Sequence, residues 1–282
     1  MTESDAILVT GATGTTGSRL VARLAAAGLR VTAAGRSATA MDGARAVRFD
    51  WDDPDTYGDA LAGADRVYLI PPPGSPDPAA VMLPFLRRAR AAGVRRAVLL
   101  SSSAIPAGGP AVGRVHQALP DLFDEWAVLR PSWFMQNFTG DHAHAHSIRS
   151  EGVIRTAAGE GRVGFVDAED IAAVAFRALT DTRAPNTDLI LTGPSALNHR
   201  EVAEVLSEVT GRSVVHEELT PEQLRDRLAA FMPAEFAALL AGMDRAIAAG
   251  AEDRTTDTVR SVTGLPPLDF RAVALREAAR SR

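Results

Sequence analysis

Short runs of strand-forming residues alternate with longer Ala- and Leu-rich stretches through the first half of the chain. These runs lie at 6–9, 30–33, 47–49, 67–70, 97–100, 127–129 and 189–191. The stretches 17–27 and 79–92 have helical character, and each stops at a glycine, a residue common just past a helix end. Strands that alternate with helices indicate βαβ units and a parallel sheet.

Beyond Gly193 the pattern changes to helices alone. We expect these helices at roughly 200–210, 221–231 and 234–249, with a last one from near Asp269. The sequence therefore predicts an α/β fold: a Rossmann-type doubly wound parallel sheet in residues 1–193, followed by a smaller, mainly helical capping domain in 194–282. Two loops rich in proline, 71–74 and 105–110, follow predicted strands, where ligands bind in open α/β sheets.

Composition and charge narrow the possible functions. The 30 Lys and Arg against 35 Asp and Glu give a net charge of −5, which disfavours a nucleic-acid partner because phosphate binding needs a basic surface. There is no cysteine, so disulfides, thiolate metal sites and cysteine nucleophiles are excluded. The acidic start is unlike a signal peptide, and no apolar run reaches about 18 residues, so we expect a cytoplasmic protein without a membrane segment.

A glycine-rich turn, TGATGTTG at 10–17, follows the first predicted strand and opens the first predicted helix. Its glycines, Gly11, Gly14 and Gly17, permit a tight turn, close approach of the backbone to a pyrophosphate and close packing of helix on sheet. The N-terminus of the helix then offers free N–H groups to the phosphates. A merely tight connection would look similar, but this strand–turn–helix context favours dinucleotide binding.

The end of the second predicted strand bears on the choice of cofactor. It carries Arg36 and Ser37, where an NAD-selective site would carry an acid for the ribose 2′-hydroxyl. A guanidinium can bind a 2′-phosphate with two charged hydrogen bonds. Arg36 could also be a solvated arginine at a strand end, but the missing acid favours a role in binding NADPH. Asp50, after the third strand, either meets the adenine amino group or belongs to an exposed acidic turn.

Seven segments occur together in a distinctive order along the chain. They are TGATGTTG, GRS, FDWDD, VYLIPPP, LLSSSA, LRPSWFMQNF and FVDAEDIAAVA. In this order they resemble the NmrA-like atypical short-chain dehydrogenase/reductases, in particular the branch with ergot-alkaloid-type reductases and bacterial quinone reductases. The resemblance covers about residues 6–215, and LRPSWFMQNF at 129–138 is its most distinctive part.

This resemblance implies an NADP(H)-binding Rossmann domain, a small capping domain and a pocket between them, lined also by 132–160. It implies that the pyrophosphate is held by Gly11, Thr13, Gly14, Thr16 and Gly17, the 2′-phosphate by Arg36, and the ribose by a site near Pro71 and Pro72. Ser101–Ser103 would lie under the nicotinamide, and the substrate contacts would be Trp133, Phe134, Gln136 and Asn137. From the residues alone, the aromatic side chains of this last group could equally be core.

The chain departs from the wider superfamily where the chemistry takes place. The usual Tyr-x-x-x-Lys dyad is absent, and the helix expected to carry it holds His116 as its one group with a pKa suited to general acid work. Ser102 and Ser103 can orient a substrate or simply cap the following turn.

Three other polar groups are expected to be structural. A solvated helix face accounts for the alternating His142, His144 and His146 better than a metal site or a pocket lining does. Asp167 and Asp170 are expected to cap a helix start. A second solvated face is expected for the basic run of Arg87, Arg88, Arg90, Arg95 and Arg96.

The sequence thus favours an NADPH-dependent reductase that moves hydride to a small, planar organic molecule. An imine or iminium, an enone or a quinone suits a site without the dyad better than a simple ketone does, because these acceptors need less help from an acid. One alternative is a catalytically silent sensor of NADP(H), which the missing dyad supports. Another is an isomerase or cyclase on the same fold. No metal is expected, and the oligomeric state is left open.

Overall fold

The computed structural model describes residues 6–75 and 77–280 of the chain. These residues form two compact units. The N-terminal unit comprises 6–130 and Ile171–Ile190, and the C-terminal unit comprises Pro131–Asp170 and the residues from Leu191 on. The sequence pattern placed one boundary, at residue 193, whereas here the chain also enters the C-terminal unit at 131–170.

The N-terminal unit is built on a seven-stranded sheet, whose order is β3-β2-β1-β4-β5-β6-β8. The strands are β1 (Ala6–Thr10), β2 (Arg30–Gly35), β3 (Ala44–Arg48), β4 (Ala64–Leu69), β5 (Arg96–Leu100), β6 (Glu125–Pro131) and β8 (Thr187–Leu191). The pairings from β3 across to β6 are all parallel. This is the strand order of a Rossmann fold, and it confirms the predicted fold class.

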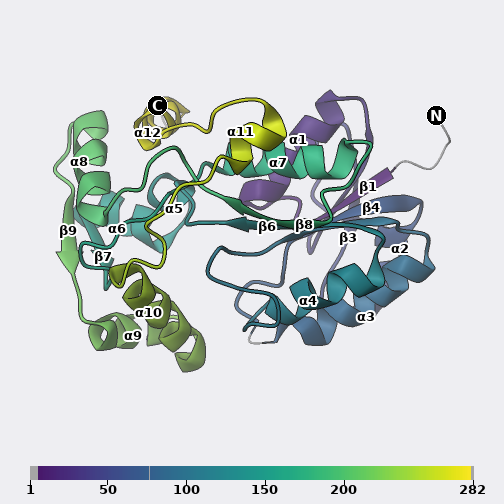
Figure 1. Ribbon diagram of the computed structural model, residues 1–282, viewed down its shortest axis with the longest axis horizontal. Helices are drawn as coiled ribbons and strands as arrows, with labels where there is room; N and C mark the ends of the chain where they lie inside the picture. The colour runs from purple at the N-terminus through teal and green to yellow at the C-terminus, as the bar shows by residue number, and fades with distance from the viewer. Residues whose placement is uncertain (1–5, 76, 281–282) are drawn as a thin grey trace. The chain divides into compact units, whose positions relative to one another are not determined.

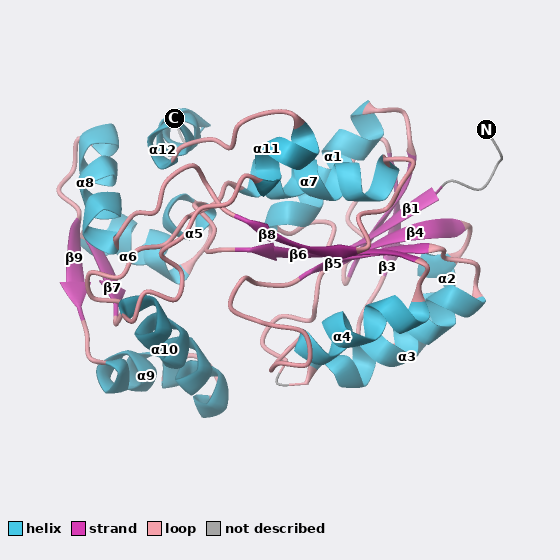
Figure 2. Ribbon diagram, in the orientation of Figure 1, coloured by secondary structure: helices cyan, strands magenta, loops and turns pink. Residues whose placement is uncertain are grey.

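Helices cover both faces of this sheet, which explains why its central strands are continuous apolar runs. All residues of β1, AILVT, are buried, as expected of a parallel strand covered on both faces. Figures 1 and 2 show α1 and α7 on one face and α3 and α4 on the other. The helices of this unit are α1 (Thr15–Ala26), α2 (Tyr57–Leu61), α3 (Pro78–Ala91), α4 (Gly113–Leu122) and α7 (Ala168–Thr180), with a 3-10 turn at Pro54–Thr56.

One arginine of the basic run is not on a solvated face. Arg96 is only 2% exposed. Its guanidinium donates to the carbonyls of Leu179 at 3.0 Å and Asp181 at 2.7 Å, and it pairs with Glu125 at 2.8 Å. A positive charge is favourable at the C-terminus of a helix, so Arg96 fastens the end of α7 to the sheet. The other four arginines of the run are exposed as expected.

The C-terminal unit is mainly helical and contains a small parallel sheet of β7 (Val153–Thr156) and β9 (Val215–Glu218). Its helices are α5 (Gln136–Thr139), α6 (Ala143–Glu151), α8 (His199–Thr210), α9 (Pro221–Ala229), α10 (Ala234–Ala248), α11 (Thr258–Thr263) and α12 (Phe270–Arg280). The predicted helices correspond to α8, α9, α10 and α12. The sequence pattern did not reveal β9, because its four residues are largely polar and exposed.

The core of this unit centres on an aromatic cluster. Phe138 meets Phe165 and Phe270 edge to face, with ring centroids 5.2 Å and 5.7 Å apart. Pairs of this geometry add roughly 0.5–1.5 kcal/mol to the burial of the rings. The cluster therefore ties α5 and α12 to the same core.

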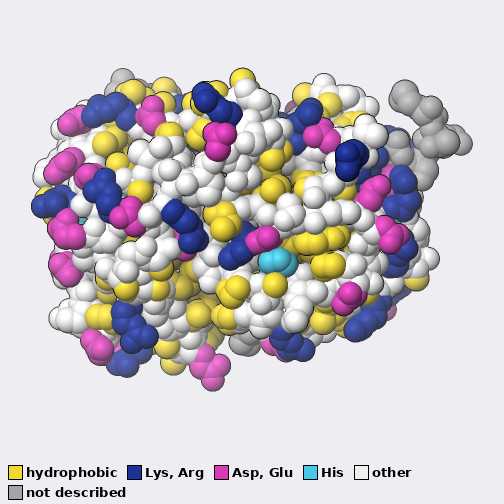
Figure 3. All heavy atoms as spheres, viewed as in Figure 1, with side chains coloured by type: hydrophobic (Ala, Val, Ile, Leu, Met, Phe, Trp, Pro, Cys, Tyr) yellow, Lys and Arg dark blue, Asp and Glu magenta, His cyan; other side chains and the backbone are white. Residues whose placement is uncertain are grey.

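The surface carries charges of both signs. On the face shown in Figure 3, basic and acidic side chains are interspersed rather than segregated into large patches. Within the described part of the chain, no helix is both long and apolar enough to cross a membrane.

Candidate functional site

The glycine-rich turn adopts a shape that only glycine tolerates. Gly11 has a φ of +58°, and a Cβ there would lie 3.1 Å from the Cβ of Ile70. A Cβ on Gly17 would lie 2.3 Å from the carbonyl oxygen of Gly11. Gly14 is the N-cap of α1, and no side chain caps this end. The first N–H groups of α1 are thus left for a ligand, as anion binding at a helix N-terminus requires.

A groove of about 340 Å³ lies against this turn, at the carboxyl ends of the first four strands. Its lining consists of Gly11, Thr13, Gly14, Gly35, Arg36, Phe49, Asp50, Trp51, Asp52, Ile70, Pro71, Pro72 and Pro73. It unites seven of the nine residues predicted to bind the cofactor. The other two, Thr16 and Gly17, are buried in α1. Gly17 allows the helix to pack closely against the turn.

A hydrogen-bond hub at Ile70 holds the groove together. The Thr10 hydroxyl accepts from the Ile70 N–H at 2.8 Å and donates to the Tyr68 carbonyl at 3.2 Å. The Trp51 indole N–H donates to the Ile70 carbonyl at 3.1 Å. These bonds lock together the segments that follow β1, β3 and β4. This role of Thr10 and Trp51 could not be predicted from the sequence, because it joins residues 60 and 19 positions apart through tertiary contacts.

Arg36 stands at the rim of the groove with its side chain exposed. Within the described residues, its guanidinium makes neither an ion pair nor a hydrogen bond to the protein. No acidic residue ends β2, whose sequence is RVTAAG. The guanidinium is therefore available for an anionic group in the groove. Asp50 also lines the groove, and its carboxylate accepts the Asp52 N–H at 3.1 Å.

The loop after β5 is held by a charged pair. Arg130 donates to the carbonyl of Ser103 at 2.8 Å and pairs with Asp188 at 2.5 Å. The Ser102 hydroxyl accepts the Ala104 N–H at 3.3 Å, which is the turn-capping role weighed above. Ser103 is buried. Arg130 thus fixes the backbone of the segment expected beneath the nicotinamide.

His116 lies on α4 and is only 6% exposed. Its Nδ1 is buried without a hydrogen-bond partner in the described structure. Burial lowers the pKa of His116, with opposing smaller influences from Asp188 and Arg130. The ring is therefore neutral at pH 7. A neutral imidazole can donate a hydrogen bond to a ligand, but it is a much weaker acid than the protonated ring.

Neither tyrosine of the chain replaces the missing dyad. The Tyr57 hydroxyl donates to the Trp51 carbonyl at 2.7 Å, and Tyr68 is fully buried. The sequence contains no lysine at all, so no ammonium group is present to lower the pKa of a phenol. The N-terminal unit consequently offers hydrogen bonds but no strong general acid.

In the C-terminal unit, the four predicted substrate contacts fall into two groups. Trp133, Phe134 and Asn137 are partly exposed and have surface to offer a ligand. Gln136 is only 6% exposed. Its amide donates to Asp167 at 2.6 Å and accepts the Ala168 N–H at 2.9 Å. Gln136 is therefore placed to hold this segment in position rather than to touch a substrate.

Asp167 does more than cap a helix. It accepts a backbone hydrogen bond from Glu169, as a cap does, but it is fully buried and also binds Arg276 at 2.8 and 3.0 Å. Burial alone would raise the pKa of Asp167, but the hydrogen bonds from Arg276 and Gln136 outweigh it and hold the pKa below its ordinary value. Asp170, also expected to cap, accepts the N–H of Leu268 at 3.0 Å.

The alternating histidines do not share a solvated face. His142 caps α6 by accepting the His144 N–H at 3.2 Å, and only His146 is exposed. His144 stacks on Phe138 at 5.5 Å and lies near His199. Burial lowers the pKa of both His144 and His199 to about 3. In the described residues, no group of three or more His, Asp or Glu side chains could hold a metal ion.

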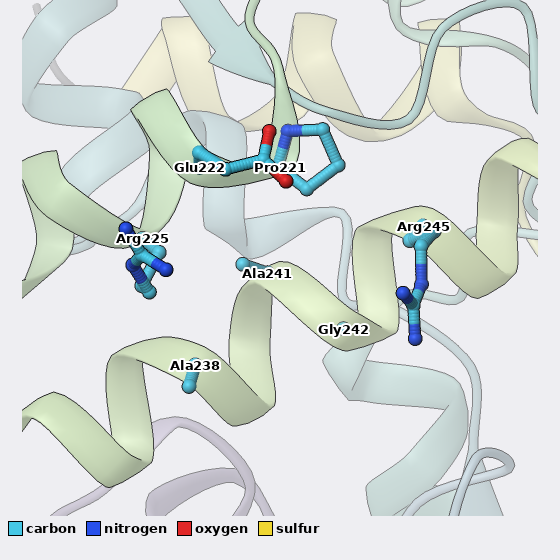
Figure 4. A pocket seen from close by; sticks show the side chains of 7 residues that line it. All are labelled: Pro221, Glu222, Arg225, Ala238, Ala241, Gly242 and Arg245. Carbon is cyan, nitrogen blue, oxygen red and sulfur yellow. The ribbon is translucent and has the colours of Figure 1, made fainter.

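A second groove, of about 200 Å³, lies between α9 and α10 in the C-terminal unit (Figure 4). Arg225 and Arg245 extend from the two helices beside a floor of small residues, Ala238, Ala241 and Gly242. Glu222 also lines the groove, and Arg225 pairs with Asp226 at 2.7 Å. The acidic side chains of Glu222 and Asp226 partly offset the two arginines. The first groove remains the candidate site because it is the one built on the glycine-rich turn.

Comparison with known proteins agrees with this geometry. Residues 11–182 match a family model described as NAD(P)H-binding, and residues 125–264 match the NmrA-like family. An uncharacterized oxidoreductase of Bacillus subtilis is 44% identical over 99% of this chain and 97% of its own length. Festuclavine synthase II of Penicillium roqueforti is 38% identical over 96% of this chain and 98% of its own.

A solved structure supports the same fold. The NADPH-dependent quinone oxidoreductase of Escherichia coli, complexed with NADPH, superimposes with a TM-score of 0.79 at 23% identity and covers 96% of this chain and 99% of its own. The family models and the full-length relatives, taken with the glycine turn, place the chain plainly. It belongs to the NmrA-like family of NAD(P)H-binding oxidoreductases.

Proposed function

We propose that the protein is an NADPH-dependent reductase of a small, planar organic acceptor: an imine or iminium, an enone or a quinone. The observation that carries the cofactor choice is the unpaired, exposed guanidinium of Arg36 at the rim of the groove. When bound, the nicotinamide supplies the hydride, and the protein orients the two reactants and excludes water. Gly11, Thr13 and Gly14 would hold the pyrophosphate, with Asp50, Pro71 and Pro72 beside the adenosine half.

The test of the cofactor choice is calorimetric titration with NADPH and NADH. A bidentate charged contact to the 2′-phosphate contributes roughly 1.5–3 kcal/mol, so we expect a preference for NADPH of about ten- to a hundredfold. Arg36→Ala should abolish this preference while leaving NADH binding unchanged. Arg87→Ala, which removes an exposed arginine of α3, is the matched control. Equal affinity of the native protein for both dinucleotides would contradict the proposal.

The proposed class of acceptor follows from how much help the product of hydride transfer needs from a proton donor. Hydride transfer to an unactivated ketone leaves an alkoxide, which needs an acid, whereas an iminium already carries its positive charge. Enones and quinones spread the new negative charge and need only hydrogen bonds. A neutral His116 and a chain without lysine suit these acceptors, with Ser102 or Ser103 as orienting partners. Trp133, Phe134 and Asn137 are the proposed contacts for the planar acceptor, and Gln136 supports them.

Loss of NADPH absorbance tests the acceptor class with a 1,4-naphthoquinone, a cyclic iminium salt, a conjugated enone and an unactivated ketone. We expect turnover with at least one of the first three and none with the ketone. Efficient reduction of the ketone would overturn the argument from the proton. His116→Ala tests whether His116 donates to the acceptor, and a loss of about 10²–10⁴-fold in rate would identify it as a general acid. An unchanged rate and pH profile would remove His116 from the mechanism.

A second function, a sensor of NADP(H), is favoured by one observation, the absence of both members of the dyad. Tight dinucleotide binding without turnover of any acceptor in the panel would support the sensor over the reductase.

A further inference from the structure

The segment Trp133–Gln136 runs alongside Val166–Ala168 and is bonded to it residue by residue. The Val166 N–H donates to the Trp133 carbonyl at 3.0 Å, and the Met135 N–H donates to the Val166 carbonyl at 3.0 Å. These two bonds form a short bridge of strand type between Phe134 and Val166. Backbone pairing therefore fixes the beginning of the segment.

Side chains take over where this pairing ends. At Gln136 the amide oxygen accepts the Ala168 N–H at 2.9 Å, and the amide nitrogen donates to Asp167 Oδ1 at 2.6 Å. Gln136 is the first residue of α5, and Asn137 follows it. The orientation of the Asn137 side chain therefore depends on the position of the Asp167 carboxylate.

The Asp167 carboxylate is held from the far end of the chain. Arg276, on α12, donates Nη1 to Oδ2 at 2.8 Å and Nη2 to Oδ1 at 3.0 Å. This fork geometry fixes the plane of the carboxylate as well as its position. Asp167 is 0% exposed, so water cannot substitute for the guanidinium. From the same helix, Phe270 packs against Phe138 of α5.

We infer that Arg276 is a positioning residue for the acceptor. By holding Asp167 it anchors Gln136, which precedes Asn137, and also Val166, the neighbour of Asp167 whose N–H donates to the Trp133 carbonyl. The C-terminal helix thereby tunes acceptor binding without touching the acceptor. The inference rests on the proposed function for its kinetic consequence, but its structural consequence is measurable without any turnover.

The structural test uses the tryptophans, of which the chain has three. Trp51 and Trp126 belong to the N-terminal unit, and Trp133 belongs to the segment in question. In protein labelled with 5-fluorotryptophan, Trp133→Phe assigns the Trp133 fluorine resonance. We expect Arg276→Lys, which keeps the charge but removes the fork, to shift or broaden that resonance and leave the other two unchanged.

Arg271→Lys is the matched control. Arg271 lies on the same helix, but its partner is Glu208 at the surface. This substitution should leave all three fluorine resonances in place. A folded Arg276→Lys protein whose Trp133 resonance coincides with that of the native protein would overturn the inference.

The kinetic test uses a 1,4-naphthoquinone as the probe acceptor. Misplacing a contact by about 1 Å can cost roughly a hundredfold in rate, so we expect Arg276→Lys to lower kcat/KM for the quinone by about ten- to a hundredfold. The loss should fall mainly on KM, and the affinity for NADPH should not change. A merely structural pair would lower the melting temperature and leave KM unaltered, which would refute the positioning role. Absence of turnover by the native protein contradicts the proposed function instead, and the fluorine spectra alone then decide the inference.

A second variant guards against misfolding. Asp167→Asn combined with Arg276→Gln replaces the ion pair by two amides, which leaves no unpaired charge in the interior. One amide bond cannot reproduce the fork, so we expect a Trp133 resonance displaced from its native position. A native spectrum and a native KM in this double variant would overturn the inference.

Discussion

The two units meet their functional demands in opposite ways. The N-terminal unit presents groups that are left free for a ligand: among the described residues, these are the uncapped N–H groups of α1 and the guanidinium of Arg36. In the C-terminal unit, by contrast, the fully buried carboxylate of Asp167 is bound by Gln136 and Arg276. Donors that bind a charged cofactor must be left free, whereas a charge buried in the interior must be paired.

This contrast has an energetic side. Exposed charges interact through water and are screened by salt, so each contributes little to folding but remains available to a ligand. Buried charges are held by their partners, and removal of a partner leaves a charge that water cannot reach. The two units should therefore respond differently to mutation, acid and salt.

The largest expected effect is on stability, from Arg276→Ala. This change leaves the carboxylate of Asp167 buried without its cation, which typically costs about 3–5 kcal/mol. Urea denaturation should show the loss. The control is Arg271→Ala, which removes a surface ion pair worth about 0–1 kcal/mol. Similar losses in the two variants would mean that the burial of Asp167 carries no special weight.

The second largest expected effect is that of acid on stability, through a buried histidine of the C-terminal unit. Because the pKa of His144 is about 3 in the folded protein, far below its ordinary value near 6.5, the unfolded chain binds a proton first as the pH falls. The contribution of this histidine to stability is thus present above about pH 6.5 and is lost progressively towards pH 3. His144→Phe preserves the stack on Phe138 and removes the titration.

Between pH 6 and pH 4, the native protein should lose roughly 2–3 kcal/mol more stability than His144→Phe. Comparison of the two proteins cancels other titrations, such as that of Asp244, whose pKa burial raises to about 6. Denaturation curves at several pH values measure the difference. Parallel pH dependence in the two proteins would show that His144 is already solvated in the folded state.

The smallest expected effect is that of salt on cofactor binding. Arg36 is exposed, so raising the ionic strength from low to about 0.5 M should weaken NADPH binding a few-fold, equivalent to about 1 kcal/mol or less. Arg36→Ala should lose most of this dependence, and NADH should show little in either protein. Salt-independent binding of NADPH would indicate that the 2′-phosphate is recognised elsewhere.

Particular residues show how far sequence reasoning reaches. The positions of Gly11, Gly14 and Arg36 followed from local rules, since a strand, a glycine turn and a helix occupy neighbouring residues and leave few geometries open. His144 and Arg96 were taken as solvated, because periodicity shows which residues share a face but not what covers that face. Gln136 was grouped with its neighbours as a substrate contact, although its amide is turned inward to Asp167.

The sequence by itself therefore determined the Rossmann-type fold class, the glycine-rich turn and the family resemblance, all of which rest on local motifs and their order along the chain. Only the tertiary structure decided that residues 131–170 join the C-terminal unit and that Arg276 holds Asp167, a partner 109 residues away. The physical reason is that a buried charge takes whichever partner the packed chain brings within hydrogen-bond reach. That choice depends on long-range packing, which no local pattern records.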